Sequence, residues 1–145
     1  MIKLVDLRSL PDHQAVALTW QLLEERPIEA SISHRQMPSW EKHKEYVLNH
    51  PYRVWNAIDA AGSGMVGTVL LTEHNEIGIA ILREHQRRGY ARAAVKMLME
   101  EYRPAAEIAG RRSGYFLANV NPHNGASIAL FLGLGGRLIQ HTYEL

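Results

Sequence analysis

The sequence predicts an α/β fold: a mixed β-sheet with helices on both faces, in the order β-α-α-β-β-β-α-β-α-β. Three observations predict it. Short apolar runs bounded by turn residues indicate strands, apolar residues at helical spacing indicate helices, and residues 76–101 join an apolar strand to a helix through a tight basic turn. The chain has 145 residues, a length typical of one domain, so we expect residues 1–145 to form a single unit.

The first third of the chain predicts one strand and two helices. A strand is expected at residues 2–8, and Ser9 and Asp12 then resemble a capping box at the start of the first helix. Its apolar face has three residues at helical spacing: Val16, Trp20 and Leu23. Residues 27–38 have no clean period and are expected to form a loop, which leads into a second helix at about 40–49.

Three strands are expected in the middle of the chain. Residues 52–59 and 65–72 form a predicted hairpin, because a glycine-containing turn separates them. Residues 76–82 are almost continuously apolar, which indicates a strand buried on both faces. Gly78 within this strand suggests a bulge or a close approach of another backbone.

A basic turn, Arg87-Arg88-Gly89, follows the third of these strands and opens a helix that Pro104 ends. The apolar face of this helix is expected to contain Ala91, Val95, Leu98 and Tyr102. Backbone N–H groups at a helix N-terminus point outward and carry partial positive charge. The turn is therefore suited to binding an anion such as a phosphate.

The last third of the chain predicts a strand, a short helix and a final strand. The strand is expected at residues 115–120 and the helix at 125–134, where two glycines end it. Residues 137–145 alternate between apolar and polar well enough to predict a strand.

The composition excludes several classes of function. A formal net charge of +1 favours neither a nucleic-acid nor a membrane partner, and the absence of cysteine excludes disulfides, thiolate metal sites and a cysteine nucleophile. His34, His43 and His50 lack the spacing of metal ligands, so no metal is expected. No signal peptide and no apolar run of about 18 residues is visible, which predicts a cytoplasmic protein.

Two motifs resemble the GNAT N-acetyltransferase superfamily. Residues 86–91, Gln-Arg-Arg-Gly-Tyr-Ala, are similar to the family's Q/R-x-x-G-x-G/A loop, which wraps the pyrophosphate of acetyl-CoA. Residues 124–135 resemble its N-x-x-S/A-x-x-x-Y/F-x-x-x-G helix. The resemblance is firm over residues 52–136 and rests on element order before them. It implies acetyl-CoA as cosubstrate, held where the strands at 76–82 and 115–120 splay apart.

The resemblance implies a set of donor-binding residues. The backbone of Ala80, Ile81 and Leu82 would pair with the pantetheine arm like an added strand, with an N–H near Ile81 polarising the thioester carbonyl. The pyrophosphate would lie on the loop formed by Gln86, Arg87, Arg88, Gly89, Tyr90 and Ala91. Asn124 would contact the pantetheine arm, although a plain turn or helix-cap role fits its position as well.

The resemblance also suggests catalytic residues. Glu76 matches a position where several family members keep a catalytic glutamate, but a strand-end residue facing solvent explains it equally well. Many relatives have a tyrosine at the position of Phe131 that is proposed to protonate the leaving thiolate. Phenylalanine cannot do this, which leaves Ser127, and more weakly Tyr143, as proton donors; a small packing role for Ser127 stays open.

The acceptor is less well defined by sequence. Five residues of the first loop, the second helix and the hairpin can line a pocket for a small amine or an amino sugar, or can be core residues: His34, Met37, Trp40, Tyr52 and Trp55. The chain stops soon after Gly136, where many relatives have further strands, so a homodimer that supplies a strand is one expectation.

The function expected from the resemblance is acetyl transfer from acetyl-CoA to a primary amine of a small molecule or protein. The alternative is a non-catalytic acyl-CoA-binding or regulatory module, prompted by Phe131 and the short C-terminus. A nucleic-acid-binding domain using the arginines is disfavoured by the net charge and by the lack of a basic face with interspersed aromatics.

Overall fold

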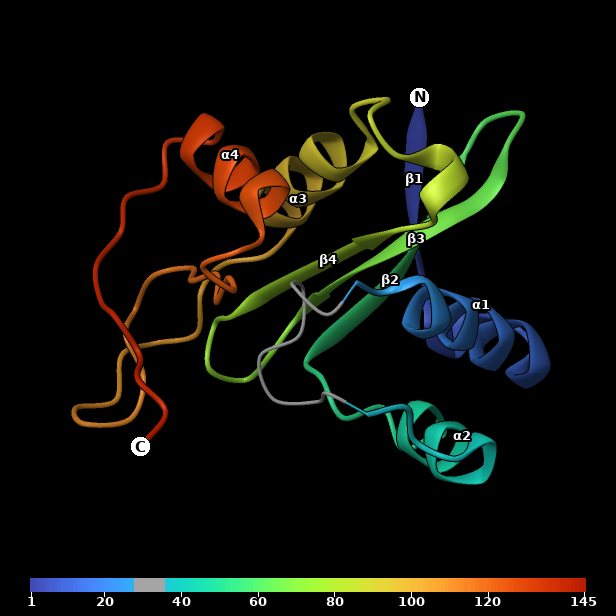
Figure 1. Cartoon of the computed structure of the whole chain (residues 1–145), viewed down its shortest axis with the longest axis horizontal. Helices are drawn as coiled ribbons and strands as arrows, with labels where there is room; N and C mark the ends of the chain where they lie inside the picture. The colour runs from blue at the N-terminus through green and yellow to red at the C-terminus, as the bar shows by residue number, and fades with distance from the viewer. Residues whose placement is uncertain (28–35) are drawn as a thin grey trace.

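The computed structural model describes residues 1–27 and 36–145. Its centre is a four-stranded sheet in the order β1-β2-β3-β4, in which each neighbouring pair is antiparallel. The strands are β1 (Ile2–Asp6), β2 (Val54–Ala60), β3 (Gly64–Leu71) and β4 (Ile77–Ile81). The sheet is therefore a meander to which the N-terminal strand adds at one edge, leaving β4 at the other edge (Figure 1).

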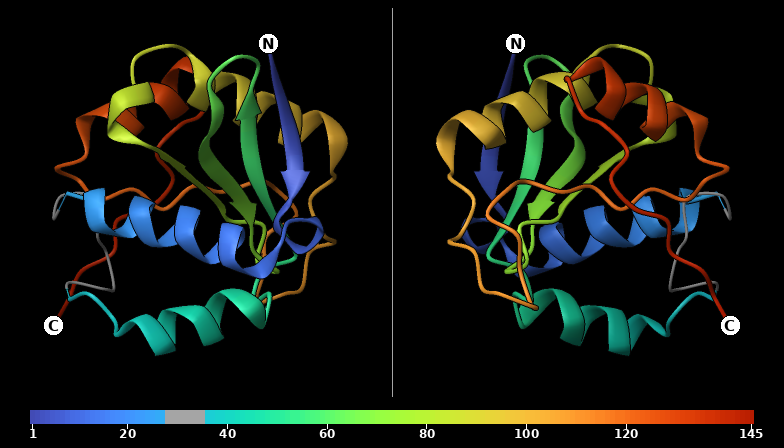
Figure 2. Two further views of the ribbon diagram at one scale, coloured as in Figure 1. Left: turned by 90° about the vertical axis from the view of Figure 1, so that its right-hand side faces the viewer. Right: turned by 90° about the vertical axis from the view of Figure 1, so that its left-hand side faces the viewer.

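Helices cover both faces of the sheet, as the sequence predicts (Figures 1 and 2). On one face lie α1 (Asp12–Glu25) and α2 (Trp40–Leu48); on the other lie α3 (Tyr90–Glu101) and α4 (Gly125–Gly133). The predicted α/β class is confirmed.

Two apolar layers hold the helices to the sheet, and the alternation along β2 explains both. Ile58 is fully buried on the α3 side, where it packs with Val95 and Leu98, whereas Ala57 is fully buried on the α1 side with Val16. Successive strand residues point to opposite faces, so a strand covered on both sides is apolar at adjacent positions.

Gly67 of β3 explains how closely β3 and β4 pack. A Cβ atom at this position would lie 2.2 Å from the carbonyl oxygen of Ala80, so only glycine fits. The predicted irregularity at Gly78 takes another form: the side chain of Leu70 fills the space where a Cβ would stand. The register shift of the sheet lies instead between Ile58 and Asp59.

Asn75 fixes the long connection that follows α3. It is fully buried and has a left-handed backbone (φ 67°). Its Nδ2 donates to the carbonyl oxygens of Ala105 (3.0 Å) and Ser113 (2.7 Å), and its Oδ1 accepts from the Ala105 N–H (2.7 Å). One amide side chain thus ties two parts of an irregular segment to the β3–β4 turn.

Of the two serines near helix starts, only Ser39 caps an α-helix. Ser39 caps α2, since its Oγ accepts a hydrogen bond from the Lys42 N–H at 3.2 Å. The predicted capping box at Ser9 is wrong. Residues Leu7–Ser9 form a short 3-10 helix, the Ser9 hydroxyl donates to the Asp6 carbonyl, and Pro11 occupies the N-cap of α1.

Two predicted strands do not form. Residues 115–120 have a single parallel bridge to the sheet, between Glu76 and Leu117, and residues 137–145 are irregular and exposed throughout. Leu138, Ile139 and Tyr143 therefore lack the neighbouring strand that alternation alone suggested. A backbone needs a partner edge to become a strand, and apolar alternation does not supply one.

Candidate active site

The basic turn before α3 has the geometry of an anion site. Gly89 is the N-cap with a left-handed backbone (φ 82°), and Arg87 before it is also left-handed (φ 63°). Among the described residues no side chain caps this helix, and its first turn contains no acidic residue. The first helical bond runs from the Ala93 N–H to the Gly89 carbonyl, so the amides of residues 90–92 precede it and can bind a phosphate.

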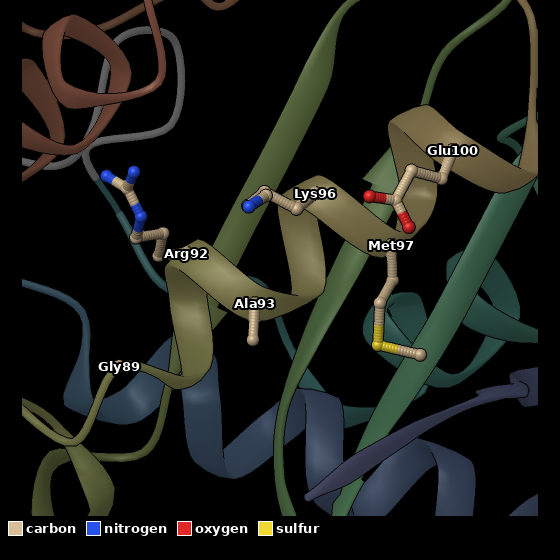
Figure 3. A pocket seen from close by; sticks show the side chains of 6 residues that line it. All are labelled: Gly89, Arg92, Ala93, Lys96, Met97 and Glu100. Carbon is tan, nitrogen blue, oxygen red and sulfur yellow. The ribbon is translucent and has the colours of Figure 1, made fainter.

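An open hollow of about 390 Å³ extends from this turn along α3 (Figure 3). Its lining residues come from successive turns of the helix: Gly89, Arg92, Ala93, Lys96, Met97 and Glu100. Arg92 also links the two helices of this face, because its Nη1 donates to the Gly133 carbonyl at the end of α4 (3.1 Å). Arg92 and Lys96 thus add positive charge beside the N-terminus of α3.

β4 presents an open edge beside this turn. In the antiparallel pairing with β3, the Leu82 N–H donates to the Val66 carbonyl, whereas the Ile77 N–H donates away from β3, to Leu117. Backbone direction alternates along a strand, so Ile79 and Ile81 also direct their N–H groups to the open edge. This register corrects the expectation that the backbone of Ala80 and Leu82 pairs with the pantetheine arm, because both residues direct their backbone N–H and C=O groups to β3.

Gln86 contributes to the same edge. Its Nε2 donates to the Ile81 carbonyl at 3.0 Å, which ties the basic turn to the end of β4. Ile81 directs both its N–H and its carbonyl to the open edge. Because Gln86 binds the carbonyl, only the N–H of Ile81 remains for another partner.

β4 and residues 115–120 separate just beyond Glu76. The backbones meet through two bonds, Ile77 N–H to the Leu117 carbonyl (2.7 Å) and Leu117 N–H to the Asn75 carbonyl (2.8 Å). Glu76 stands at this junction and is half-buried. Its carboxylate accepts from the Thr72 hydroxyl at Oε1 (3.3 Å) and from the Asn119 amide at Oε2. The expected splay is therefore present, with a carboxylate at its apex.

The predicted residues of α4 have mixed positions. Asn124 is the N-cap, with its Oδ1 accepting from the Ser127 N–H at 3.2 Å, so the helix-cap role left open by the sequence is present. Phe131 packs against the core on the α3 side. Tyr143 is 78% exposed and stacks near His141, so the structure does not bring it to the other site residues.

The predicted acceptor residues divide between two aromatic clusters. Trp40 contacts Trp20 and His43 with ring centroids at 5.2 and 6.5 Å. Tyr52 and Trp55 contact each other at 4.9 Å. His34 lies outside the described residues, and Met37 is exposed.

A third ring, Tyr46, completes the second cluster. It lies 6.0 Å from the ring of Tyr52 and 6.2 Å from that of Trp55, and the tyrosine hydroxyls are hydrogen-bonded to each other. Burial raises the pKa of Tyr52, as does the bond to Tyr46. The Trp55 Nε1 atom is buried and has no hydrogen-bond partner within the described part of the chain.

Sequence reasoning missed three residues of this region: Tyr46, Ile79 and Asn119. Ile79 follows from the register once β3–β4 pairing is known. Asn119 lies in a stretch expected to be a strand, where a polar residue signals only an exposed face. Among the described residues, no group of three or more metal-ligating side chains occurs, and no helix there has the length and apolarity to cross a membrane.

A comparison with protein families decides what kind of domain this is. The family described as "Acetyltransferase (GNAT) domain" matches residues 4–137. The chain belongs to the GNAT acetyltransferase family. It is thus an N-acetyltransferase in class, of a family that uses acetyl-CoA. No curated protein matches the sequence.

Solved GNAT structures share the fold. An acetyltransferase from Thermus thermophilus superimposes with a TM-score of 0.68 at 18% identity, over 97% of this chain and 89% of that one. The dodecameric spermidine N-acetyltransferase from Vibrio cholerae gives 0.64 at 18% identity, over 99% and 85%. YncA from Salmonella typhimurium, solved with its cofactor acetyl-CoA, gives 0.61 at 13%, over 93% and 78%.

Proposed function

We propose that this GNAT domain transfers the acetyl group of acetyl-CoA to a primary amine of a small molecule or protein, by direct attack on the thioester. One observation carries the proposal. The open edge of β4 connects a carboxylate, Glu76, to an uncapped helix N-terminus at Gly89. A donor with a phosphate at one end and a reactive acyl group at the other suits this arrangement.

The donor would bind along that edge. The pyrophosphate would accept hydrogen bonds from the amides of residues 90–92, and Arg87, Arg88, Arg92 and Lys96 would add positive charge. The pantetheine arm would pair with the Ile81 N–H and with the outward carbonyl of Ile79. The Ile79 N–H, the nearer of the two outward N–H groups to Glu76, would polarise the thioester carbonyl, as an oxyanion donor does.

Acetyl transfer requires the acceptor to lose a proton. An alkyl ammonium with a pKa of about 10.4 is rarely neutral at pH 7, and deprotonating it costs about 4.6 kcal/mol. Glu76 would accept that proton, directly or through water. The amine nitrogen then bonds to the carbonyl carbon, the carbon–sulfur bond breaks, CoA leaves as thiolate, and the nitrogen releases its second proton to the thiolate or to water. Leaving as thiolate costs only about 2 kcal/mol at pH 7, so Phe131 in place of a tyrosine acid is tolerable, with Ser127 as the candidate donor.

The acceptor would approach from the α1–α2 side of the sheet. On this side, Trp55 of β2, Leu70 of β3 and Gly78 of β4 are cross-strand neighbours. Trp55 therefore places its aromatic cluster with Tyr46 and Tyr52 two strands from Gly78, on the same face of the sheet. Trp40 would add an exposed ring. Spermidine is the acceptor named for the Vibrio cholerae relative, and it is one amine to test here.

Self-association and a cytoplasmic location complete the proposal. No residue of α4 is buried, and Ile128 and Leu132 expose apolar side chains that a second copy of the chain would cover. Sedimentation at several concentrations would detect such a homodimer.

The test is release of free thiol from acetyl-CoA with a panel of primary amines. We expect turnover with at least one amine. Calorimetric binding of acetyl-CoA without thiol release on any amine would favour the alternative, a non-catalytic acyl-CoA-binding module.

Glu76→Gln provides the matched test of the base. Glutamine keeps the size and one acceptor oxygen, so it retains one of the two hydrogen bonds that Glu76 accepts from Thr72 and Asn119, but it cannot take up a proton. We expect turnover to fall about 100-fold, most severely at acidic pH where free amine is scarce. A variant with an unaltered pH–rate profile would remove Glu76 as the base.

A further inference from the structure

Within the described part of the chain, Asn119 is the side chain that reaches Glu76 across the splay. It lies two residues beyond the Leu117 bridge, on the segment that diverges from β4, and it is exposed. Its Nδ2 donates to Oε2 of Glu76, while the Thr72 hydroxyl donates to Oε1. The Thr72 hydroxyl in turn accepts from the Glu76 N–H at 3.1 Å, so its hydrogen bonds to Glu76 stabilise the β3–β4 turn.

The Asn119 amide has a second function to offer. A primary amide carries both a donor nitrogen and an acceptor oxygen, and here the nitrogen is the atom directed to Glu76. Its Oδ1 is then a neutral acceptor next to a carboxylate, with the two groups standing on opposite sides of the splay. An ammonium group has only donors and needs several acceptors.

We propose that Asn119 is a positioning residue for the acceptor amine, and that it makes the enzyme selective for primary amines. This inference rests on the proposed function. Glu76 and Oδ1 of Asn119 together bind the incoming ammonium, while Nδ2 of Asn119 keeps the Glu76 carboxylate facing the amine.

Proton counting gives the selectivity. A primary ammonium has three N–H groups: Glu76 takes the first proton, the nitrogen loses the second as the amide forms and CoA leaves, and the third stays on Oδ1 of Asn119. That retained N–H directs the nitrogen lone pair to the thioester carbon. An N-methylated acceptor has only two N–H groups and loses both in forming its amide, so no N–H remains for Oδ1 of Asn119.

The experiment compares wild type, Asn119→Ala and the control His123→Ala by thiol release, using a primary amine and its N-methyl derivative. His123 is exposed on the same segment, and its contact to Asn121 uses only its backbone N–H, which alanine keeps. We expect Asn119→Ala to lower kcat/KM for the primary amine about 10- to 100-fold through a higher acceptor KM, as for a lost hydrogen bond to a charged group. The KM for acetyl-CoA and the melting temperature should not change.

The preference for the primary amine separates positioning from a structural role. Wild type and His123→Ala should favour the primary amine about tenfold, and Asn119→Ala should lose that preference. An Asn119→Ala enzyme with an unchanged acceptor KM, or with the preference intact, overturns this assignment alone. A folded wild type that acetylates no amine removes the proposed function, and this assignment with it.

Discussion

Asn75 shows how much of this fold depends on one residue. It is fully buried, it adopts a left-handed backbone, and its side chain makes three hydrogen bonds to the connection after α3. Glu76 follows it directly, and the Leu117 N–H donates to the carbonyl of Asn75. Asn75 therefore places both sides of the splay.

Replacing Asn75 should cost more stability than its position in a turn suggests. We expect Asn75→Ala to lower the free energy of unfolding by about 3–4 kcal/mol, because three buried hydrogen bonds are lost and alanine is strained in the left-handed region. Asn75→Gly removes the same bonds without the strain and should recover about 1 kcal/mol. Urea denaturation measures both. Equal losses in the two variants would mean that the backbone conformation costs alanine nothing.

The sequence could identify residues whose role is local. The helix after Gly89 and the helix at about 40–49 follow from short-range patterns, and both predictions are confirmed. The roles of Asn75 and Asn119 could not be found this way, because their partners lie 30 or more residues away and no periodicity encodes them.

At the scale of the element, the N-terminus of α3 offers a direct test of donor binding. A Cβ at Gly89 would meet no atom within 4 Å, so substitution there strains only the backbone. Gly89→Glu and Gly89→Gln share that strain and differ in charge. We expect calorimetry to show that Glu abolishes acetyl-CoA binding, whereas Gln weakens it at least tenfold less. Identical affinities in two folded variants would remove the phosphate from this turn.

The two serines near helix starts make a second pair. Ser39→Ala should destabilise the protein by about 1 kcal/mol, since it removes the cap of α2. Ser9→Ala should cost less than about 0.5 kcal/mol, because Ser9 caps no α-helix and is exposed. Chemical denaturation of both variants checks the difference, and a larger loss at Ser9 would contradict the assignment of Pro11 as the N-cap.

The sequence predicted those elements in which apolar periodicity is matched by a neighbouring strand or sheet face to pack against. The hairpin of β2 and β3 has both, as does the amphipathic α3. Residues 115–120 and 137–145 have strand-like composition, but the backbone of the first segment pairs with the sheet only at the Leu117 bridge, and the second segment lies away from the sheet (Figure 1).

At the scale of the whole molecule, stability should depend on pH through His43. This residue is 6% exposed, its Nε2 lies 2.9 Å from the Thr19 hydroxyl, and burial lowers its pKa against the opposing effect of a hydrogen bond with Val16. Below about pH 6.5 the unfolded chain binds a proton there that the folded chain does not. Stability therefore falls as pH falls through that value towards the lower folded pKa.

His43→Gln should flatten this dependence between pH 7 and pH 5. The matched control is His13→Gln, at an exposed histidine of α1, which should keep the wild-type slope. Thermal unfolding across this pH range distinguishes them. A wild-type slope retained in His43→Gln would place the responsible proton on another group.

The open edge of β4 has a consequence beyond catalysis. Backbone groups that can pair with a pantetheine arm can equally pair with a strand of another chain, which is how unprotected sheet edges start ordered aggregation. If the donor occupies that edge, it competes with this reaction for the same hydrogen bonds. Acetyl-CoA would then determine how long the enzyme remains dispersed as well as how fast it works, and starvation for the donor would shorten the lifetime of the protein in solution.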